Sequence, residues 1–62
     1  MNKRKFDLQP GDRIRTKRHH WTVTYVSDHV FGVERMTTTG IKKDCLQKKD
    51  YEYRLMEIEK VK

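Results

Sequence analysis

The clearest pattern of apolar and polar positions in the chain is the run of residues 21–26, WTVTYV. Tryptophan, threonine, valine and tyrosine all favour the half-buried surface of a β-strand. Trp21 and Val23 are two positions apart and share one face of such a strand, whereas Val26 follows three positions later. A step of three within a period of two predicts a β-bulge that bends the strand. We therefore expect a bent central strand.

Three more segments have the short apolar or alternating runs typical of strands, namely residues 13–17, 30–36 and 41–47. They are separated by turn-forming stretches at residues 9–12, 27–29 and 37–40. Pro10 and Gly11 suit the central positions of a β-turn, because proline fixes a negative φ and glycine accepts a positive one. This order of strands and short turns predicts successive antiparallel hairpins.

Residues 51–61 are compatible with two structures. Tyr53, Leu55 and Ile58 repeat the two-then-three spacing of the central strand, which favours a bent strand that closes a barrel. Tyr51, Leu55 and Ile58 also fall at helical spacing, and Asp50 suits the start of a helix. We favour the strand, because a fifth strand would pair with an edge that four strands leave open. A helical last segment is the alternative.

The chain is short enough to form only one domain, and a domain of this size buries about 60% of the surface that the unfolded chain exposes. We expect a mainly β barrel of five strands over residues 8–59, preceded by a frayed basic arm at residues 1–5. Phe6 and Leu8 are expected to cap the core. The core itself is expected to consist of Ile14, Trp21, Val23, Val26, Phe31, Val33, Leu46 and Leu55.

A family resemblance supports this fold. The Pro10-Gly11-Asp12 turn before a basic strand, the Trp21-x-Val23-x-x-Val26 strand, the two hairpins and the short closing strand resemble a small SH3-like β-barrel, including KOW domains. The likeness covers residues 8–59 and implies a module that binds nucleic acid or peptide. The chain also resembles short proteins of phages and mobile elements in Gram-positive bacteria.

Positive charge is concentrated at one end of the chain. The formal net charge is +6, and residues 1–20 alone hold seven Lys and Arg against two Asp. Such asymmetry either attracts polyanions or keeps a very small domain soluble. We therefore weigh two classes of function: a nucleic-acid-binding module of low sequence specificity, and a protein-interaction adaptor or inhibitor of phage or mobile-element origin.

The basic and aromatic residues around the first two strands are the best candidates for a binding surface. Arg13, Arg15 and Lys17 alternate with Ile14 and Thr16, so the three cations are expected to leave one face of the sheet together. Cations beside exposed rings suit a single-stranded nucleic acid. Trp21 is expected to pack in the core rather than stack on bases. The predicted nucleic-acid-binding residues are Arg13, Arg15, Lys17, Arg18, Tyr25, Lys42 and Lys43.

Other chemistry is not expected. His19, His20, His29 and Cys45 lack the spacing of a zinc site, and the acidic residues show no catalytic pairing. We expect no enzymatic activity, metal, cofactor or small-molecule substrate. The single cysteine and the lack of an apolar segment after the basic start suggest a cytoplasmic protein with no membrane partner.

The first prediction concerns Trp21. Replacing Trp21 by Ala removes a large ring from a small core and should cost about 3–5 kcal/mol. A domain of this size has about 3–5 kcal/mol of stability in total, so the variant should be unfolded. Far-ultraviolet circular dichroism tests this, and a folded variant with a wild-type urea midpoint would contradict it.

Overall fold

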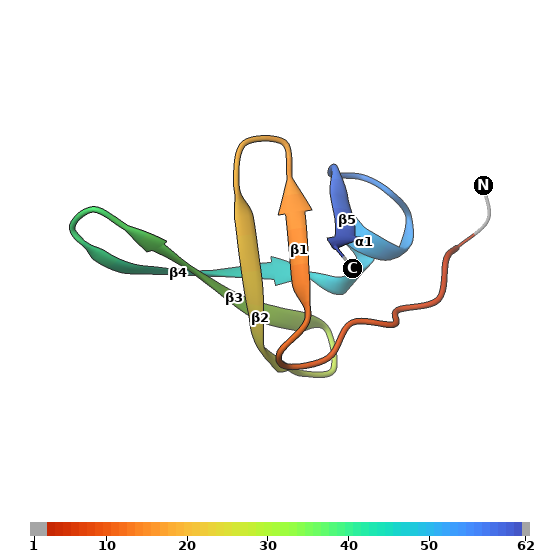
Figure 1. Ribbon diagram of the computed structural model, residues 1–62. Helices are drawn as coiled ribbons and strands as arrows, with labels where there is room; N and C mark the ends of the chain where they lie inside the picture. The colour runs from red at the N-terminus through yellow and green to blue at the C-terminus, as the bar shows by residue number, and fades with distance from the viewer. Residues whose placement is uncertain (1–2, 62) are drawn as a thin grey trace.

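The computed structural model describes residues 3–61, which form one antiparallel sheet and a short helix (Figure 1). The elements in chain order are β1 (Arg13–Thr16), β2 (His20–Val26), β3 (Val30–Thr37), β4 (Gly40–Gln47), α1 (Lys48–Glu52) and β5 (Ile58–Val61). The strand order across the sheet is β4-β3-β2-β1-β5, and every pair is antiparallel. The prediction of a mainly β domain with five strands is confirmed.

The sheet remains open, in contrast to the expected closed barrel. β4 and β5 are its two edges and do not pair with each other. The reason lies in the stretch that joins them: after β4 the chain turns into α1, and β5 has only four residues. Tyr51 of α1 is 3% exposed and belongs to the core. A helix and its tyrosine thus cover the part of the core that we expected a longer closing strand to cover.

β2 is bent at the predicted place. Its register with β3 shifts between Val23 and Tyr25, which is the bulge that the spacing indicated. Trp21 and Val23 point into the core, whereas Tyr25 is exposed. Figure 1 shows the consequence: β1 and β2 cross in front of β3 and β4 at a steep angle. The bend allows one sheet to fold over its own core.

The core agrees with the prediction except at its C-terminal end. The buried side chains are Leu8, Ile14, Trp21, Val23, Phe31, Val33, Tyr51 and Ile58. Val26 and Leu46 are partly buried, and Phe6 packs against the core as expected. Leu55, however, is 61% exposed, so its predicted burial is wrong. The chain reverses after α1 through Arg54, which has a φ of +56°, and this turn carries Leu55 away from the core.

The last segment combines both structures considered for it, at other boundaries. The helix begins at Lys48, between the strand predicted at residues 41–47 and the last segment predicted at residues 51–61, and it ends at Glu52. The strand begins only at Ile58. Tyr51 and Ile58 are both buried, one from the helix and one from the strand. Neither apolar spacing was correct as a whole, because Tyr53 and Leu55 are exposed and lie in the turn between the helix and the strand.

The basic arm is not frayed at Arg4. The Arg4 side chain donates from Nε to the carbonyl oxygen of Tyr51 at 2.8 Å and from Nη2 to that of Ile58 at 2.6 Å. Its guanidinium lies 3.8 Å from the centre of the Tyr51 ring. These contacts tie the arm to α1 and β5, which explains why the expectation of a free arm was wrong there. Met1 and Asn2 lie outside the described residues.

The first turn forms as predicted. The amide of Asp12 donates to the carbonyl oxygen of Gln9 at 3.0 Å, and Gly11 has a φ of +96°. The Asp12 carboxylate in turn accepts from the amide of Gln9 at 3.0 Å. β1 follows directly, but ends at Thr16 rather than Lys17.

Tyr51 generates a prediction for stability at high pH. Burial and the 2.6 Å hydrogen bond from its hydroxyl to Asp7 raise the pKa of Tyr51 from 10.0 to about 12. Because folding raises this pKa, the stabilisation is complete below pH 10 and is lost as pH rises from 10 towards 12. Tyr51→Phe should cost about 1.5 kcal/mol at pH 7.

The measurement is the urea midpoint at pH 7, 9 and 11. Every other side chain is the same in both proteins, so the comparison with Tyr51→Phe isolates the contribution of Tyr51. The difference between the two midpoints should shrink at pH 11. A constant difference across this range would contradict the account.

Candidate nucleic-acid interface

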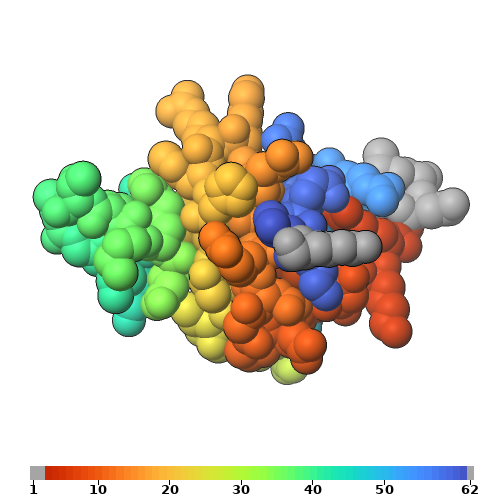
Figure 2. Space-filling model, in the orientation of Figure 1, coloured from red at the N-terminus to blue at the C-terminus, as the bar shows by residue number. Residues whose placement is uncertain are grey.

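The cations of β1 lie where the alternation placed them. Ile14 is fully buried, and Arg13 and Arg15 are exposed on the opposite face. Lys17 follows in the turn after β1 and is also exposed. Figure 2 shows residues of β1 and the following turn on the surface of the molecule. We call Arg13, Arg15 and Lys17 the β1 row.

One acidic residue lies beside the β1 row. Glu59 of β5 is the cross-strand partner of Arg15 and therefore shares its face of the sheet. The Glu59 carboxylate is 3.2 Å from Nη1 of Arg4, which approaches it from the edge of the sheet. Arg15 thus makes none of the ion pairs found within residues 3–61.

Lys42 and Lys43 are separated by the alternation of β4. Lys43 pairs with Glu34 on the outer face, whereas Lys42 pairs with Arg35 on the face that continues the core. β4 is not a neighbour of β1, because β2 and β3 lie between them. Three strand spacings of about 4.8 Å amount to about 14 Å. Lys43 therefore shares the face of the β1 row but does not extend it directly.

Tyr25 is exposed, as its position after the bulge predicted. Its side chain is 49% exposed on the outer face, opposite Gly32 of β3. A Cβ atom at Gly32 would overlap the tyrosine ring, so the glycine provides the space on which this ring lies. The hydroxyl is 3.6 Å from Sγ of Cys45, and this hydrogen bond raises the pKa of Tyr25. One face of the ring is covered and the other is accessible to a ligand.

A cavity that the sequence analysis did not identify lies between β2 and β3. Their pairing ends at Thr22 and Glu34, but β3 continues with β4 to the turn after Thr37. The β3–β4 hairpin therefore projects alone, as seen on the left of Figure 1. The cavity, which we call the notch, has a volume of about 390 Å³. Its walls include His19, His20 and Trp21 on one side and Glu34, Arg35 and Met36 on the other.

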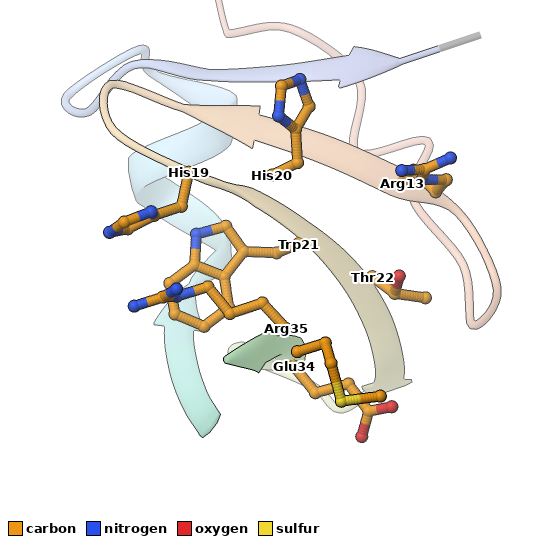
Figure 3. A pocket seen from close by; sticks show the side chains of 8 residues that line it. Arg13, His19, His20, Trp21, Thr22, Glu34 and Arg35 are labelled. Atoms are coloured by element: carbon orange, nitrogen blue, oxygen red, sulfur yellow. The ribbon is translucent and has the colours of Figure 1, made fainter. Parts of the chain in front are cut away.

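Three side chains meet on one side of the notch (Figure 3). The guanidinium of Arg35 lies 5.2 Å from the centre of the Trp21 ring. His19 meets the same ring edge-on, with 6.2 Å between centroids. The indole Nε1 of Trp21 donates to Oγ1 of Thr16 at 3.2 Å, which fixes the ring. Nε of Arg35 is buried and has no hydrogen-bond partner within residues 3–61.

Positive charge converges on His19. Loss of hydration and the nearby charges of Arg35, Lys42 and Arg18 hold the pKa of His19 below its usual 6.5. Arg18 and Lys42 are two of the predicted site residues; their charges act on His19, although neither residue lines the notch. Arg35 was missed. Its signal was the spacing of Phe31, Val33 and Arg35, which puts a cation at the end of an apolar strand face.

A second cavity is less suited to a polyanion. It has a volume of about 460 Å³ and lies between the N-terminal segment, the turn after β2 and the start of α1. Its cations include Lys3 and Lys48, but Asp28 and Glu52 line it as well. Lys3 is already 3.7 Å from the carboxylate of Glu52. Three lysines, including Lys49, and two acids thus line this cavity, and one of the lysines is already paired.

Comparisons with known proteins add no family. No protein-family model, curated protein or solved structure was found to match the chain. Within residues 3–61, no three His, Cys, Asp or Glu side chains are grouped so as to hold a metal ion. The described part of the chain also contains no helix long and apolar enough to cross a membrane.

The geometry of the notch predicts how the pKa of His19 changes when Arg35 is replaced. Arg35→Gln removes the first of the charges that lower the pKa of His19, so this pKa should rise towards 6.5. The rise should be partial, because the loss of hydration remains. Imidazole chemical shifts followed by NMR across pH 4–8 measure it. The control is Arg15→Gln, which removes the same charge from the other face; an equal rise in both variants would contradict the geometry.

Proposed function

We propose that this protein is a non-enzymatic module that binds nucleic acid with low sequence specificity. The observation that carries the proposal is a set of exposed cations that form no ion pair within residues 3–61. Within residues 3–61, the ion pairs involve Lys3, Arg4 and Lys60. The β1 row and Arg18 take no part in them, so their charges are available to neutralise phosphates.

The spacing of the β1 row suits a nucleic-acid backbone. Arg13 and Arg15 are two apart on one face of β1 and so lie about 6.5–7 Å from each other, which is close to the distance between successive phosphates of an extended strand. Lys17 follows in the turn after β1. Contacts of this kind position a backbone without reading bases. The open face of Tyr25 offers a stacking surface, which is tolerant of sequence. Low specificity follows from this combination.

The family resemblance is part of the proposal. A five-stranded antiparallel sheet whose last strand returns to pair with the first is compatible with an SH3-like module. Modules of this kind include KOW domains, and an origin in a phage or mobile element accords with the second resemblance. A cytoplasmic location would give the module access to nucleic acid.

A second candidate function is protein interaction, as an adaptor or inhibitor. The open edge of β4 favours it, because seven of the eight residues of this strand are exposed. Met36 and Ile41 pair across the projecting hairpin and are 76% and 56% exposed. An extended peptide could add to this edge through main-chain hydrogen bonds. Such docking would depend weakly on salt, whereas polyanion binding depends on it steeply.

The test is a fluorescence titration with a short single-stranded oligonucleotide at several salt concentrations. Replacing Arg13, Arg15 and Lys17 by Gln removes three charges. If each neutralises one phosphate, the slope of log affinity against log salt should become shallower by about 2.

The matched control replaces Lys5, Lys49 and Arg54 by Gln. These residues are also exposed and carry the same total charge, but lie away from the β1 row. The control should keep a slope close to that of the wild type. Equal slopes in all three proteins, or no binding by the wild type at low salt, would retire this proposal in favour of protein interaction.

A further inference from the structure

We propose that the notch between β2 and β3 binds a phosphate monoester dianion, with Arg35 as its main ligand and with Arg13 and His19 in its walls. The terminal phosphate of a nucleic-acid strand is the source that accords with the proposed function. The inference rests on that function for the source of the phosphate, but the site itself rests on the geometry of the notch.

The cations whose charges act on His19 have no ion-pair partner within residues 3–61. Arg18, Arg35 and Lys42 all act on the same imidazole, and none of them takes part in the ion pairs of residues 3–61. Asp44 is the acid that shares the strand face of Lys42, but its Oδ1 accepts from the amide of Cys45 at 2.7 Å. Cations held close together repel one another, and the attraction of a bound anion offsets this repulsion.

The guanidinium of Arg35 is a second feature of the notch that suits an anion. Its Nε is buried without an acceptor in residues 3–61, and buried donors in native proteins are nearly always hydrogen-bonded. The ring of Trp21 lies beside the guanidinium and limits its movement. A guanidinium presents its donors in a planar fork that fits phosphate oxygens. Because Nε is itself buried, a bound phosphate would accept from the terminal Nη groups of this fork.

The charge of a phosphate group distinguishes a monoester from a diester as the ligand of the notch. Each internal phosphodiester carries one negative charge, which suits the singly spaced cations of the β1 row. A phosphate monoester carries a charge of about −1.5 to −2 and has three acceptor oxygens. It therefore suits a cavity lined by Arg13, Arg35 and two histidines. The volume of about 390 Å³ is within the range of small-ligand sites, roughly 300–1,000 Å³.

The position of Arg13 connects the two surfaces. Arg13 belongs to the β1 row and also lines the notch. A strand that follows the β1 row could therefore end in the notch. Glu34 is the acidic residue of the wall, and Figure 3 shows its carboxylate directed away from the Trp21 side. The phosphate is thus expected beside Trp21, His19 and Arg35.

The experiment uses Trp21 as its reporter, because it is the only tryptophan of the chain and lies in the wall of the notch. The full chain is titrated at constant ionic strength with an oligonucleotide carrying a 5′-phosphate, with the same oligonucleotide carrying a 5′-hydroxyl, and with inorganic phosphate. The phosphorylated strand should bind about tenfold more tightly than the hydroxyl form. Inorganic phosphate should change the tryptophan fluorescence in a saturable way.

Two variants separate the notch from the β1 row. Arg35→Gln should abolish the tenfold advantage while changing the affinity of the hydroxyl form by less than about twofold. Arg15→Gln removes the same charge from the β1 row, so it should weaken both strands equally and keep the advantage. Lys42→Gln removes a further charge that acts on His19, from an exposed position where a loss of folding is not expected, and it should also reduce the advantage.

The outcomes distinguish this inference from the proposed function. Equal binding of both oligonucleotides by the wild type, or an advantage that survives in Arg35→Gln and Lys42→Gln, would overturn the notch as a phosphate site and leave the β1 row intact. Binding of inorganic phosphate that depends on Arg35, without binding of either oligonucleotide, would support the notch. That result would remove nucleic acid as the source of the phosphate and indicate a small phosphorylated molecule.

Discussion

The bend in β2 is the constraint on which the rest of the structure depends. β2 pairs with β1 through His20–Thr22 and with β3 through Thr22–Val26, so one strand serves both halves of the sheet. The bulge between Val23 and Tyr25 changes its direction and allows the two halves to enclose a common core. The pairing between β2 and β3 ends at Thr22. Beyond this point the β3–β4 hairpin has no support from β2, and the notch opens there.

A core this small leaves most of the charged residues at the surface, and strand alternation sorts them into two groups. Arg13 and Arg15 point outward from β1 because Ile14 between them is buried. Arg35 continues the inward face of β3 past the end of the core and reaches Trp21, which His19 also contacts. Lys42 pairs with Arg35 on the same face. The backbone thus creates one extended row of cations and one convergent cluster. These two arrangements suit a polyanionic strand and a single compact anion, respectively.

Local patterns predicted the fold better than they predicted which residues meet. The spacing of Trp21, Val23 and Val26 was sufficient for the bulge, because a bulge is a local event. The predicted burial of Leu55 was wrong because its environment depends on the turn at Arg54, where a non-glycine residue adopts a positive φ. Arg35 was missed for a different reason: its meeting with Trp21 depends on where the β2–β3 pairing ends. Arm residue Arg4 likewise contacts Tyr51 and Ile58 across almost the whole chain, a contact that no sequence period indicates.

The central claim is that the unpaired cations of the β1 row and the notch form one surface for phosphate groups. Amide chemical-shift mapping by NMR tests it most directly, with a 5′-phosphorylated single-stranded oligonucleotide added to the full chain. The account predicts the largest shifts in residues 13–21 and around Arg35 and Lys42, with little change in α1 and β5. Shifts confined to the edge of β4 and to α1, or no shifts at low salt, would contradict it.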